Sequence, residues 1–335
     1  MFAVVTGGGG FLGQAIVRQL IDRGDRVRSL ARGEYPALAR SGVECVRGDV
    51  RDAGTVREAC QGADVVFHTA ALAGIWGPWR EYHATNVVGT TNVIEACRAA
   101  GVGRLVFTSS PSVTFDGTAQ EGVDERAPYA TNWLAHYPHT KALAEREVLS
   151  ADGPSLATCA LRPHLIWGPG DRHLIPRLIA RARRGQLRRV GDGDNLVDMV
   201  YIDNAAQAHL QAADRLHSGS ALRGNAYFIS QGEPVNCWRW IDEILALADI
   251  RPVGRSISLK AAWRIGAALE MVYRTLHVPG EPRMTRFLAA QLGTSHYFDI
   301  ARAKRDFGYE AQVSTAEGMQ RLGQWIAQQS VASAA

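Results

Sequence analysis

The chain has 335 residues, of which 46% are hydrophobic and 21% are charged, and its net charge at pH 7 is +4. This balance is typical of a globular protein. It excludes a disordered chain and a strongly basic protein that binds nucleic acid. The five cysteines lie far apart without metal-ligand spacing, so we expect no metal site, no complete disulfide framework and a cytoplasmic location. We also expect neither a signal peptide nor a membrane span.

Short apolar segments alternate with segments of helical periodicity along most of the chain. The segments with strand character are residues 2–5, 26–30, 43–46, 64–69, 104–109, 156–161, 196–201 and 226–229. The segments with helical periodicity are residues 11–23, 55–60, 81–100, 137–149, 173–184, 203–215 and 238–248, followed by a mainly helical region from about residue 259. Alternating strands and helices predict an α/β fold with a doubly wound parallel sheet.

A glycine-rich turn joins the first predicted strand to the first predicted helix. Gly7, Gly10 and Gly13 give the pattern G-x-x-G-x-x-G. Gly7 permits a sharp turn, Gly10 lets backbone N–H groups approach a pyrophosphate, and Gly13 lets the helix pack on the strand. Phe11 and Leu12 begin the helix, whose N-terminal partial positive charge favours phosphate groups. The pattern predicts a dinucleotide site, although a glycine-rich surface turn would have the same residues.

Residues at the ends of the second and third strands indicate which dinucleotide binds. No acid ends the second strand, where NAD sites place a carboxylate, and Arg32 stands where it can pair with the 2′-phosphate of NADP. We therefore predict that NADP(H) is preferred, with NAD(H) as the alternative if Glu34 binds the ribose. Asp49 suits the adenine amino group, and Val50 offers its backbone.

The chain divides into two parts without an obvious linker. We expect a dinucleotide-binding Rossmann core in residues 1–165, completed by strands and a helix that return from residues 196–230. Residues 166–195 and 231–330 are expected to form a smaller, mainly helical lobe that binds the substrate.

Tyr137 and Lys141 fall one turn apart on a predicted helix, so both can face one pocket. A free tyrosine has a pKa of about 10, and a nearby ammonium group would lower it, which suits proton transfer during oxidation of a secondary alcohol. A serine at the end of the fifth strand, either Ser109 or Ser110, would hold the substrate oxygen. Taken alone, such a pair is more often a core aromatic and a solvated charge. The glycine turn and the serines favour the catalytic interpretation.

Taken in this order, the motifs resemble the extended, or atypical, short-chain dehydrogenase/reductase superfamily. The segments that carry the resemblance are residues 6–13, 48–50, 68–71, 86–90, 107–110, 137–141, 161–163 and 200–204. The resemblance implies that Ser110 is the catalytic serine beside Tyr137 and Lys141, and that Asn86 supports the lysine through a water molecule. It also implies further cofactor contacts by Thr69, Ala70, Ala71, Thr108, Pro163 and Ile166.

Within the superfamily, residues 162–171 and 298–309 resemble the 3β-hydroxysteroid dehydrogenase family and, almost equally, the bacterial 2-alkyl-3-oxoalkanoate reductases of olefin synthesis. The resemblance implies an NADP(H)-preferring oxidoreductase that interconverts a secondary alcohol and a ketone on a large apolar molecule, a sterol or a long-chain keto acid. A nucleotide-sugar epimerase or dehydratase and a dinucleotide-sensing regulator without chemistry are the alternatives. No residue signature of a steroid isomerase is carried over.

Aromatic residues lie near the predicted active edge of the sheet. Trp76 and Trp79 follow the fourth strand, and Trp133 precedes the catalytic helix. Together with His164 they are candidate substrate contacts in a broad apolar pocket, although the tryptophans equally suit loop cores.

Residues 259–276 combine apolar helical periodicity with basic side chains. This pattern predicts a lid over the substrate, a peripheral membrane contact, or a helix packed on its own domain. The resemblance further implies a homodimer formed through residues 81–100 and 137–149.

Overall fold

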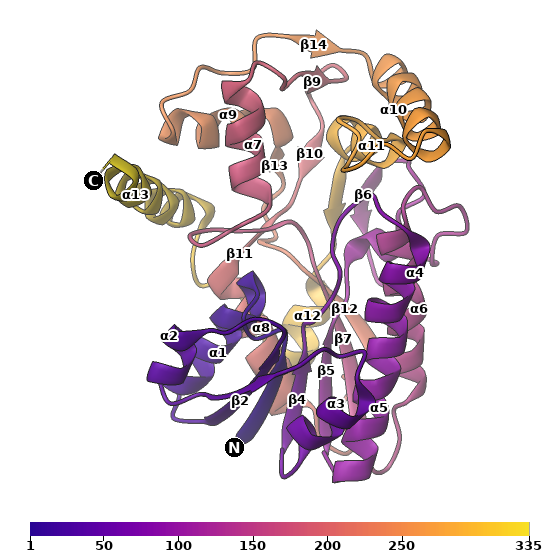
Figure 1. The fold of residues 1–335 in the computed structure, drawn as a ribbon, viewed down its shortest axis with the longest axis vertical. Coiled ribbons are helices and arrows are strands. Elements are labelled where there is room, and N and C mark those ends of the chain that lie inside the picture. The colour runs from indigo at the N-terminus through magenta and orange to yellow at the C-terminus, as the bar shows by residue number, and fades with distance from the viewer. Residues whose placement is uncertain (335) are drawn as a thin grey trace.

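Seven parallel strands form the central sheet of the computed structural model, which describes residues 1–334 (Figure 1). In spatial order they are β3 (Glu44–Arg47), β2 (Arg26–Ala31), β1 (Phe2–Thr6), β4 (Val65–His68), β5 (Arg104–Thr108), β7 (Ala157–Pro163) and β12 (Asn225–Ile229). The predicted α/β fold is confirmed. The strand order reverses between β1 and β4, so ligands are expected at the carboxyl ends of these strands.

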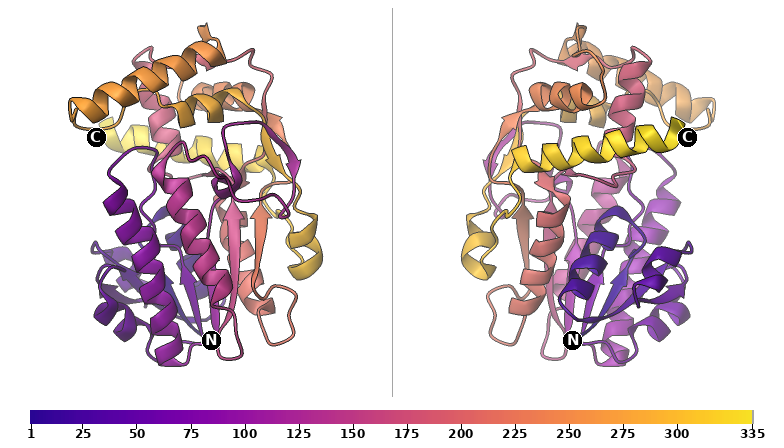
Figure 2. Two further views of the ribbon diagram at one scale, coloured as in Figure 1. Left: turned by 90° about the vertical axis from the view of Figure 1, so that its right-hand side faces the viewer. Right: turned by 90° about the vertical axis from the view of Figure 1, so that its left-hand side faces the viewer.

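Two helical layers cover the sheet (Figure 2). Successive side chains of a strand point to opposite faces, so Ala3 and Val5 pack in one core and Val4 in the other. The first layer contains α1 (Phe11–Asp22), α8 (Ile202–Arg215) and α12 (Ala301–Phe307). The second layer contains α3 (Ala53–Cys60), α5 (Gly89–Ala100) and α6 (His136–Ser150). Burial on both faces explains why the central strands are almost wholly apolar.

The helix predicted over residues 81–100 is present but not uniform. α4 (Trp79–Tyr82) continues through a π-helical segment, His83–Val88, into α5. Such wider turns recur at functional sites, and this one contains Asn86.

A smaller sheet links the core to the lobe. Its strands, in spatial order, are β13 (Val235–Asn236), β10 (Leu196–Val197), β15 (His296–Phe298) and β6 (Gln120–Val123). The single strand predicted over residues 196–201 is therefore wrong, because β10 belongs to this sheet while β11 (Val200–Tyr201) pairs with β8 (Ile166–Trp167). The break falls at the buried Asp198, whose carboxylate accepts a hydrogen bond from the Gly232 N–H (3.0 Å).

Helices make up most of the lobe, which stands above the carboxyl edge of the central sheet (Figure 1). They are α7 (Leu174–Arg183), α9 (Cys237–Leu247), α10 (Leu259–Thr275), α11 (Arg286–Gly293) and α13 (Thr315–Ala334). The remaining elements are α2 (Pro36–Arg40), a 3-10 turn (Pro111–Thr114) and the paired strands β9 (Arg189–Val190) and β14 (Ser256–Ile257). Within residues 1–334, none of the helices has the length and apolarity needed to cross a membrane.

Candidate active site

A cavity at the carboxyl edge of β1, β2 and β4 brings together many of the residues predicted to bind the cofactor. Its volume is about 320 Å³. The predicted residues in its lining are Gly7, Gly10, Arg32, Asp49, Val50, Thr69, Ala70 and Ala71. Residues that the sequence did not single out complete the lining, including Tyr35, Leu72, Ala73, Thr85 and His173. The cavity lies where the strand order reverses, as the fold requires of a dinucleotide site.

The glycine turn has no room for side chains. A Cβ atom on Gly7, whose φ is +71°, would lie 2.8 Å from the Cα atom of Ala70, and one on Gly13 would lie 2.2 Å from the carbonyl oxygen of Gly7. Gly10 precedes α1 without a side-chain cap, so the N–H groups of the first helical turn are left for another acceptor. This cradle of backbone N–H groups fits the pyrophosphate of a dinucleotide.

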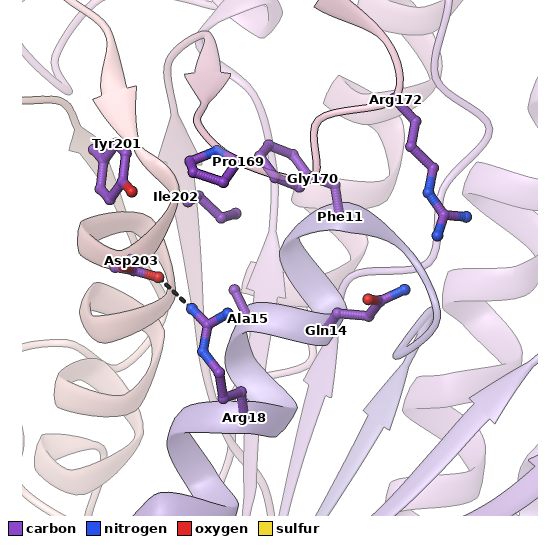
Figure 3. A pocket seen from close by; sticks show the side chains of 10 residues that line it. All are labelled: Phe11, Gln14, Ala15, Arg18, Pro169, Gly170, Arg172, Tyr201, Ile202 and Asp203. Carbon is purple, nitrogen blue, oxygen red and sulfur yellow. Dashed lines mark hydrogen bonds and ion pairs between the residues drawn. The ribbon is translucent and has the colours of Figure 1, made fainter. Parts of the chain in front are cut away.

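Three of the predicted cofactor residues direct their side chains elsewhere. The ring of Phe11 lines a separate pocket of about 270 Å³ that is bounded by Pro169 and Gly170 (Figure 3). Leu12 is buried in the core, and Ile166, in the short β8–β11 sheet, packs against the same core. Phe11 and Leu12 therefore present backbone rather than side chains to the glycine turn.

One part of the cofactor cavity carries both an arginine and an aspartate. Arg32 lines it, whereas Glu34 forms an exposed ion pair with Arg47 (3.0 Å) and lies outside the lining. A hydrogen bond from Arg51 (2.8 Å) holds the pKa of Asp49 below its usual value, against the effect of burial and with a smaller contribution from Arg32. The side chain at the end of β2 that faces the cavity is thus an arginine and not an acid.

A second cavity, of about 190 Å³, contains Ser110 and Tyr137. We call it the catalytic cavity. Pro163 and His164, at the end of β7, also line it. Ser109, in contrast, is buried, and its N–H donates to the Leu161 carbonyl in the neighbouring strand (2.6 Å). The structure therefore places Ser110 beside the tyrosine.

Tyr137 shares this cavity with Ser110, whose hydroxyl is hydrogen-bonded to that of Ser112 (2.8 Å). Burial raises the pKa of Tyr137 to about 12, although the Ser110 hydroxyl opposes the increase. Without the cofactor, burial penalises the charged phenolate and outweighs any effect of Lys141. The expected lowering of this pKa by the lysine together with a positively charged nicotinamide stays a prediction. Tyr137 is a neutral phenol at neutral pH and can donate a proton.

Lys141 is fixed at the end of β5. Its Nζ atom donates to the Thr108 carbonyl oxygen (2.5 Å) and lies 3.9 Å from the ring centroid of Phe107. Burial lowers the pKa of Lys141 to about 7, and the carboxylate of Glu145, one helical turn further on, opposes this decrease. Thr108 thus contributes its carbonyl group to the lysine, while its hydroxyl is hydrogen-bonded to His209 Nε2 (2.8 Å).

Asn86 connects the cofactor cavity to the catalytic helix. Its Oδ1 accepts from the Leu72 N–H (2.7 Å), and its Nδ2 donates to the Leu72 carbonyl (3.1 Å) and to Thr140 Oγ1 (3.0 Å). The side chain therefore ties the loop after β4 to the residue before Lys141. Its support of Lys141 through a water molecule stays a prediction.

A buried ion pair that the sequence did not predict lies behind the catalytic residues. Arg162 donates to both carboxylate oxygens of Glu145, at 3.0 and 2.6 Å, and the Tyr129 hydroxyl donates to the same carboxylate (2.7 Å). Glu145 is carried by the helix of Tyr137, and Arg162 by the strand that leads to Pro163. The pair therefore sets the position of the helix relative to the end of β7. The only sequence signal for this role is that Glu145 falls one helical turn after Lys141.

His68 forms a second buried connection that the sequence did not predict. Its Nδ1 lies 2.7 Å from Thr6 Oγ1 and its Nε2 lies 3.0 Å from Thr90 Oγ1, while the Thr90 hydroxyl donates to the Asn86 carbonyl (2.6 Å). The Thr90 oxygen must therefore accept a hydrogen bond from the Nε2–H group, which leaves Nδ1 to accept a hydrogen bond from the Thr6 hydroxyl. Burial lowers the pKa of His68 to about 3, so the neutral ring joins β1 and β4 to the π-helical segment.

A third, wider cavity of about 800 Å³ adjoins the catalytic cavity, and Ile75 lines both. Trp76 and Trp133 line this wide cavity together with Tyr273 of α10. Trp79 is absent from its lining and packs on histidine rings, with centroid distances of 4.8 Å to His139 and 5.6 Å to His83.

The outer face of α10 carries exposed apolar side chains among basic ones. Met271 is 63% exposed and Leu276, just after the helix, is 71% exposed, with Lys260 and Arg264 also at the surface. This is the pattern from which the sequence predicted a membrane contact. That contact and the homodimer stay predictions.

His164 pairs with a histidine from the lobe. His164 Nε2 lies 3.0 Å from His296 Nδ1, and both rings are buried and line the catalytic cavity. Phe298 packs edge-on against His164, with ring centroids 5.1 Å apart. Chain segments more than 130 residues apart thus meet at this cavity.

Residues 4–260 match the sequence model of the 3-beta hydroxysteroid dehydrogenase/isomerase family. The chain belongs to this family. It is 52% identical to the 2-alkyl-3-oxoalkanoate reductase of Stenotrophomonas maltophilia (strain K279a) over 96% of this chain and 98% of that protein. It is 34% identical to the sterol-4-alpha-carboxylate 3-dehydrogenase, decarboxylating, of Mus musculus over 96% of this chain and 89% of that protein.

Solved structures show the same fold. MoeE5, in complex with UDP-glucose and NAD, is 27% identical and has a TM-score of 0.76 over 99% of this chain and 100% of that chain. The resemblance predicted from the motifs is confirmed. This member of the 3-beta hydroxysteroid dehydrogenase/isomerase family is a dinucleotide-dependent oxidoreductase that acts on an alcohol or a ketone.

Proposed function

We propose that this protein is an NADP(H)-dependent reductase of 2-alkyl-3-oxoalkanoates. The observation that carries the proposal is the 52% identity to the S. maltophilia reductase over nearly the whole chain. A reductase of the same name from Shewanella oneidensis is 50% identical over 96% of this chain. Of the two apolar substrate classes predicted from the sequence, the keto acid is thus better supported than the steroid.

The names of the relatives share a chemical feature. In a 2-alkyl-3-oxoalkanoate the reacting oxygen is on C3 and the carboxylate is attached to C2. A sterol-4-alpha-carboxylate 3-dehydrogenase likewise acts at C3 of a molecule whose carboxylate is attached to the adjacent C4. In both molecules the carboxylate is bonded to the carbon atom next to the reacting carbon. That carbon atom is also bonded to a carbon chain or belongs to a ring. We infer the same arrangement in the substrate of this protein.

The geometry of the catalytic cavity suits proton donation to a ketone. A nicotinamide bound in the cofactor cavity would supply the hydride, which adds to C3. The hydroxyls of Ser110 and Tyr137 share the catalytic cavity and can both donate hydrogen bonds to the ketone oxygen. Tyr137 then transfers its proton to that oxygen, which completes the alcohol and leaves a phenolate to be reprotonated from solvent. The nearby Lys141, when charged, favours that transient phenolate.

Arg32 supports the preference for NADP(H) in this proposal. It faces the cofactor cavity at the end of β2, where a 2′-phosphate would lie, while Glu34 is engaged by Arg47. A guanidinium group pairs well with a phosphate through two parallel hydrogen bonds.

The test is an oxidation assay with the purified protein, followed by nicotinamide absorbance. The substrates are a long-chain 2-alkyl-3-hydroxyalkanoate and a 3β-hydroxysteroid, each with NADP and NAD. We expect turnover of the hydroxy acid, faster with NADP. Turnover of the steroid alone would contradict the proposal.

Oxidation of a sterol is the second candidate, because the family model covers the steroid enzymes and the cavity lined by Trp76 and Trp133 is about 800 Å³. A nucleotide sugar is less well supported. No lysine or arginine lines the catalytic cavity among the described residues, whereas Phe115, Phe287 and Phe298 do. Arg274, in the adjoining wide cavity, is the one arginine in the described lining that a substrate pyrophosphate could meet.

A further inference from the structure

The hydrogen bonds of His164 and His296 can be counted proton by proton. His164 Nδ1 lies 2.5 Å from the Asp198 carbonyl oxygen, and His296 Nε2 lies 2.7 Å from the Gln291 carbonyl oxygen. A carbonyl oxygen only accepts, so both of these outer nitrogens carry protons. The inner nitrogens, His164 Nε2 and His296 Nδ1, face each other at 3.0 Å.

Two neutral imidazole rings have one N–H group each, and both N–H groups already donate to the carbonyl oxygens. The inner contact would then bring two lone pairs together. A third proton between the inner nitrogens turns this contact into a hydrogen bond and gives the pair one positive charge. The geometry thus suits an imidazole–imidazolium pair.

The surroundings of the histidines lack any other cation. Among the described residues, the lining of the catalytic cavity contains no lysine, arginine, aspartate or glutamate. The titratable groups that face the pair are Tyr137, a neutral phenol, and Asp198. Burial raises the pKa of Asp198 to about 6, and its carboxylate accepts from Ser230 Oγ (2.7 Å) and the Gly232 N–H rather than from either imidazole.

We propose that the His164–His296 pair takes up a proton when the substrate binds, and that its positive charge then attracts the substrate's carboxylate in the catalytic cavity. This inference rests on the proposed function, because it assigns the residues that recognise the acid group of the keto acid. Gln291 lines the same cavity, and its side-chain amide has N–H groups that can donate to an anion.

The proton uptake follows from burial. With the cavity free of an anion, burial lowers the pKa of His164 to about 3 and also lowers that of His296, so the pair is neutral at neutral pH. A carboxylate in the cavity favours the charged form and raises the pKa of the pair. A group whose pKa is higher in the complex takes up protons on binding, so affinity for the acid decreases as pH rises through the pKa of the complex.

A paired carboxylate also protects the substrate. A 3-oxo acid loses carbon dioxide when the electrons of the C–C bond flow toward the ketone, and the hydrogen bonds from Ser110 and Tyr137 increase that flow. A cation beside the carboxylate holds electron density on the acid group and opposes the loss. Reduction can therefore compete with decarboxylation.

Calorimetry of the wild-type protein tests the proton uptake directly. The enzyme–NADPH complex is titrated with the 2-alkyl-3-hydroxyalkanoate, which cannot react with it, at pH 7.5 in phosphate and in Tris. We expect a difference between the two heats that corresponds to a substantial fraction of one proton taken up. The methyl ester of the same acid should show none. Absence of uptake with the acid overturns the proposal.

Kinetics of variants test which residues are responsible. We compare kcat/KM for the acid with kcat/KM for its methyl ester. Hydride transfer depends on pH in the same way for both compounds, so that dependence cancels in the ratio of the two values. We expect this ratio to decrease by up to about tenfold per pH unit above neutrality in the wild type. In His296→Gln and His164→Gln the ratio should be lower by about 10- to 100-fold at pH 7 and independent of pH, with ester turnover retained. His217→Gln, which changes an exposed histidine, is the matched control.

The outcomes separate the two proposals. Turnover of acid and ester with the same ratio at every pH leaves the proposed function standing and overturns the carboxylate site. Proton uptake on binding without turnover of either compound contradicts the proposed function instead. If a histidine variant fails to fold, the wild-type calorimetry still decides.

Discussion

The cofactor cavity and the catalytic cavity adjoin the same sheet edge but are built differently. The cofactor cavity is lined almost entirely by turns that follow β1 to β4, within residues 7–85, with His173 as the exception. The catalytic cavity combines segments from residues 74–75, 110–137, 163–165 and 287–298. The first is therefore fixed by strands that are neighbours in sequence, and the second by the docking of the lobe. Substitutions should accordingly separate cofactor binding from catalysis.

The largest expected effect is on catalysis alone. Tyr137→Phe removes the proton donor from the catalytic cavity but leaves the cofactor cavity intact. We expect kcat to fall by about 10²- to 10⁴-fold while the Kd for NADPH is unchanged. Stopped-flow turnover and fluorescence titration measure the two quantities. Tyr297→Phe, outside both linings, is the control, and similar kcat values for the two variants would contradict the assignment.

The buried ion pair between α6 and β7 should affect stability next most strongly. Glu145→Ala leaves the charge of Arg162 buried and unpaired, so we expect the free energy of unfolding to fall by about 3–5 kcal/mol. Glu243→Ala, which breaks an exposed pair with Arg239, should lower it by less than about 1 kcal/mol. Denaturant unfolding provides the comparison, and equal decreases would show that burial of the pair is unimportant.

Arg32→Ala should selectively weaken the binding of NADPH in the cofactor cavity. Loss of a charged hydrogen bond to the 2′-phosphate should raise the KM for NADPH by about 10- to 100-fold and leave that for NADH within about 3-fold. Arg47→Ala, which removes the partner of Glu34, is the control. Equal increases with the two cofactors would mean that Arg32 does not select between them.

The smallest effect is expected in the wide cavity. Trp76→Ala removes apolar surface that a long chain would cover, so KM should rise by about 3- to 10-fold for long-chain hydroxy acids. Short-chain acids, which end before this cavity, should be affected by less than about 2-fold. A chain-length series measures the difference, and uniform increases would place the substrate chain elsewhere.

Local patterns predicted the cofactor half of the molecule well. The glycine turn, Arg32 and Asp49 each follow a strand within a few residues, and parallel neighbours bring such strand ends to one edge. The choice between Ser109 and Ser110 needed either the resemblance or the structure, because adjacent residues of a strand end differ only in the face they point to.

The lobe could be predicted less well, for reasons of distance. β6 pairs with β15 across about 175 residues, and no local pattern indicates a strand partner so far away. The split of residues 196–201 depends on the hydrogen bonds of Asp198 in three dimensions. The partnership of Glu145 with Arg162 and that of His164 with His296 likewise join residues whose sequence neighbours suggest nothing about each other.

The pairing of β6 with β15 also sets the order in which the protein can mature on the ribosome. Synthesis proceeds from the N-terminus, so every strand of the central sheet has emerged before His296 is made. All residues that line the cofactor cavity, of which His173 is the last, are made before it as well. The catalytic cavity, in contrast, is complete only when residues 296–298 pair with β6, because His296 and Phe298 are part of its lining. The residues of the cofactor cavity are thus all synthesised well before those of the catalytic cavity are complete.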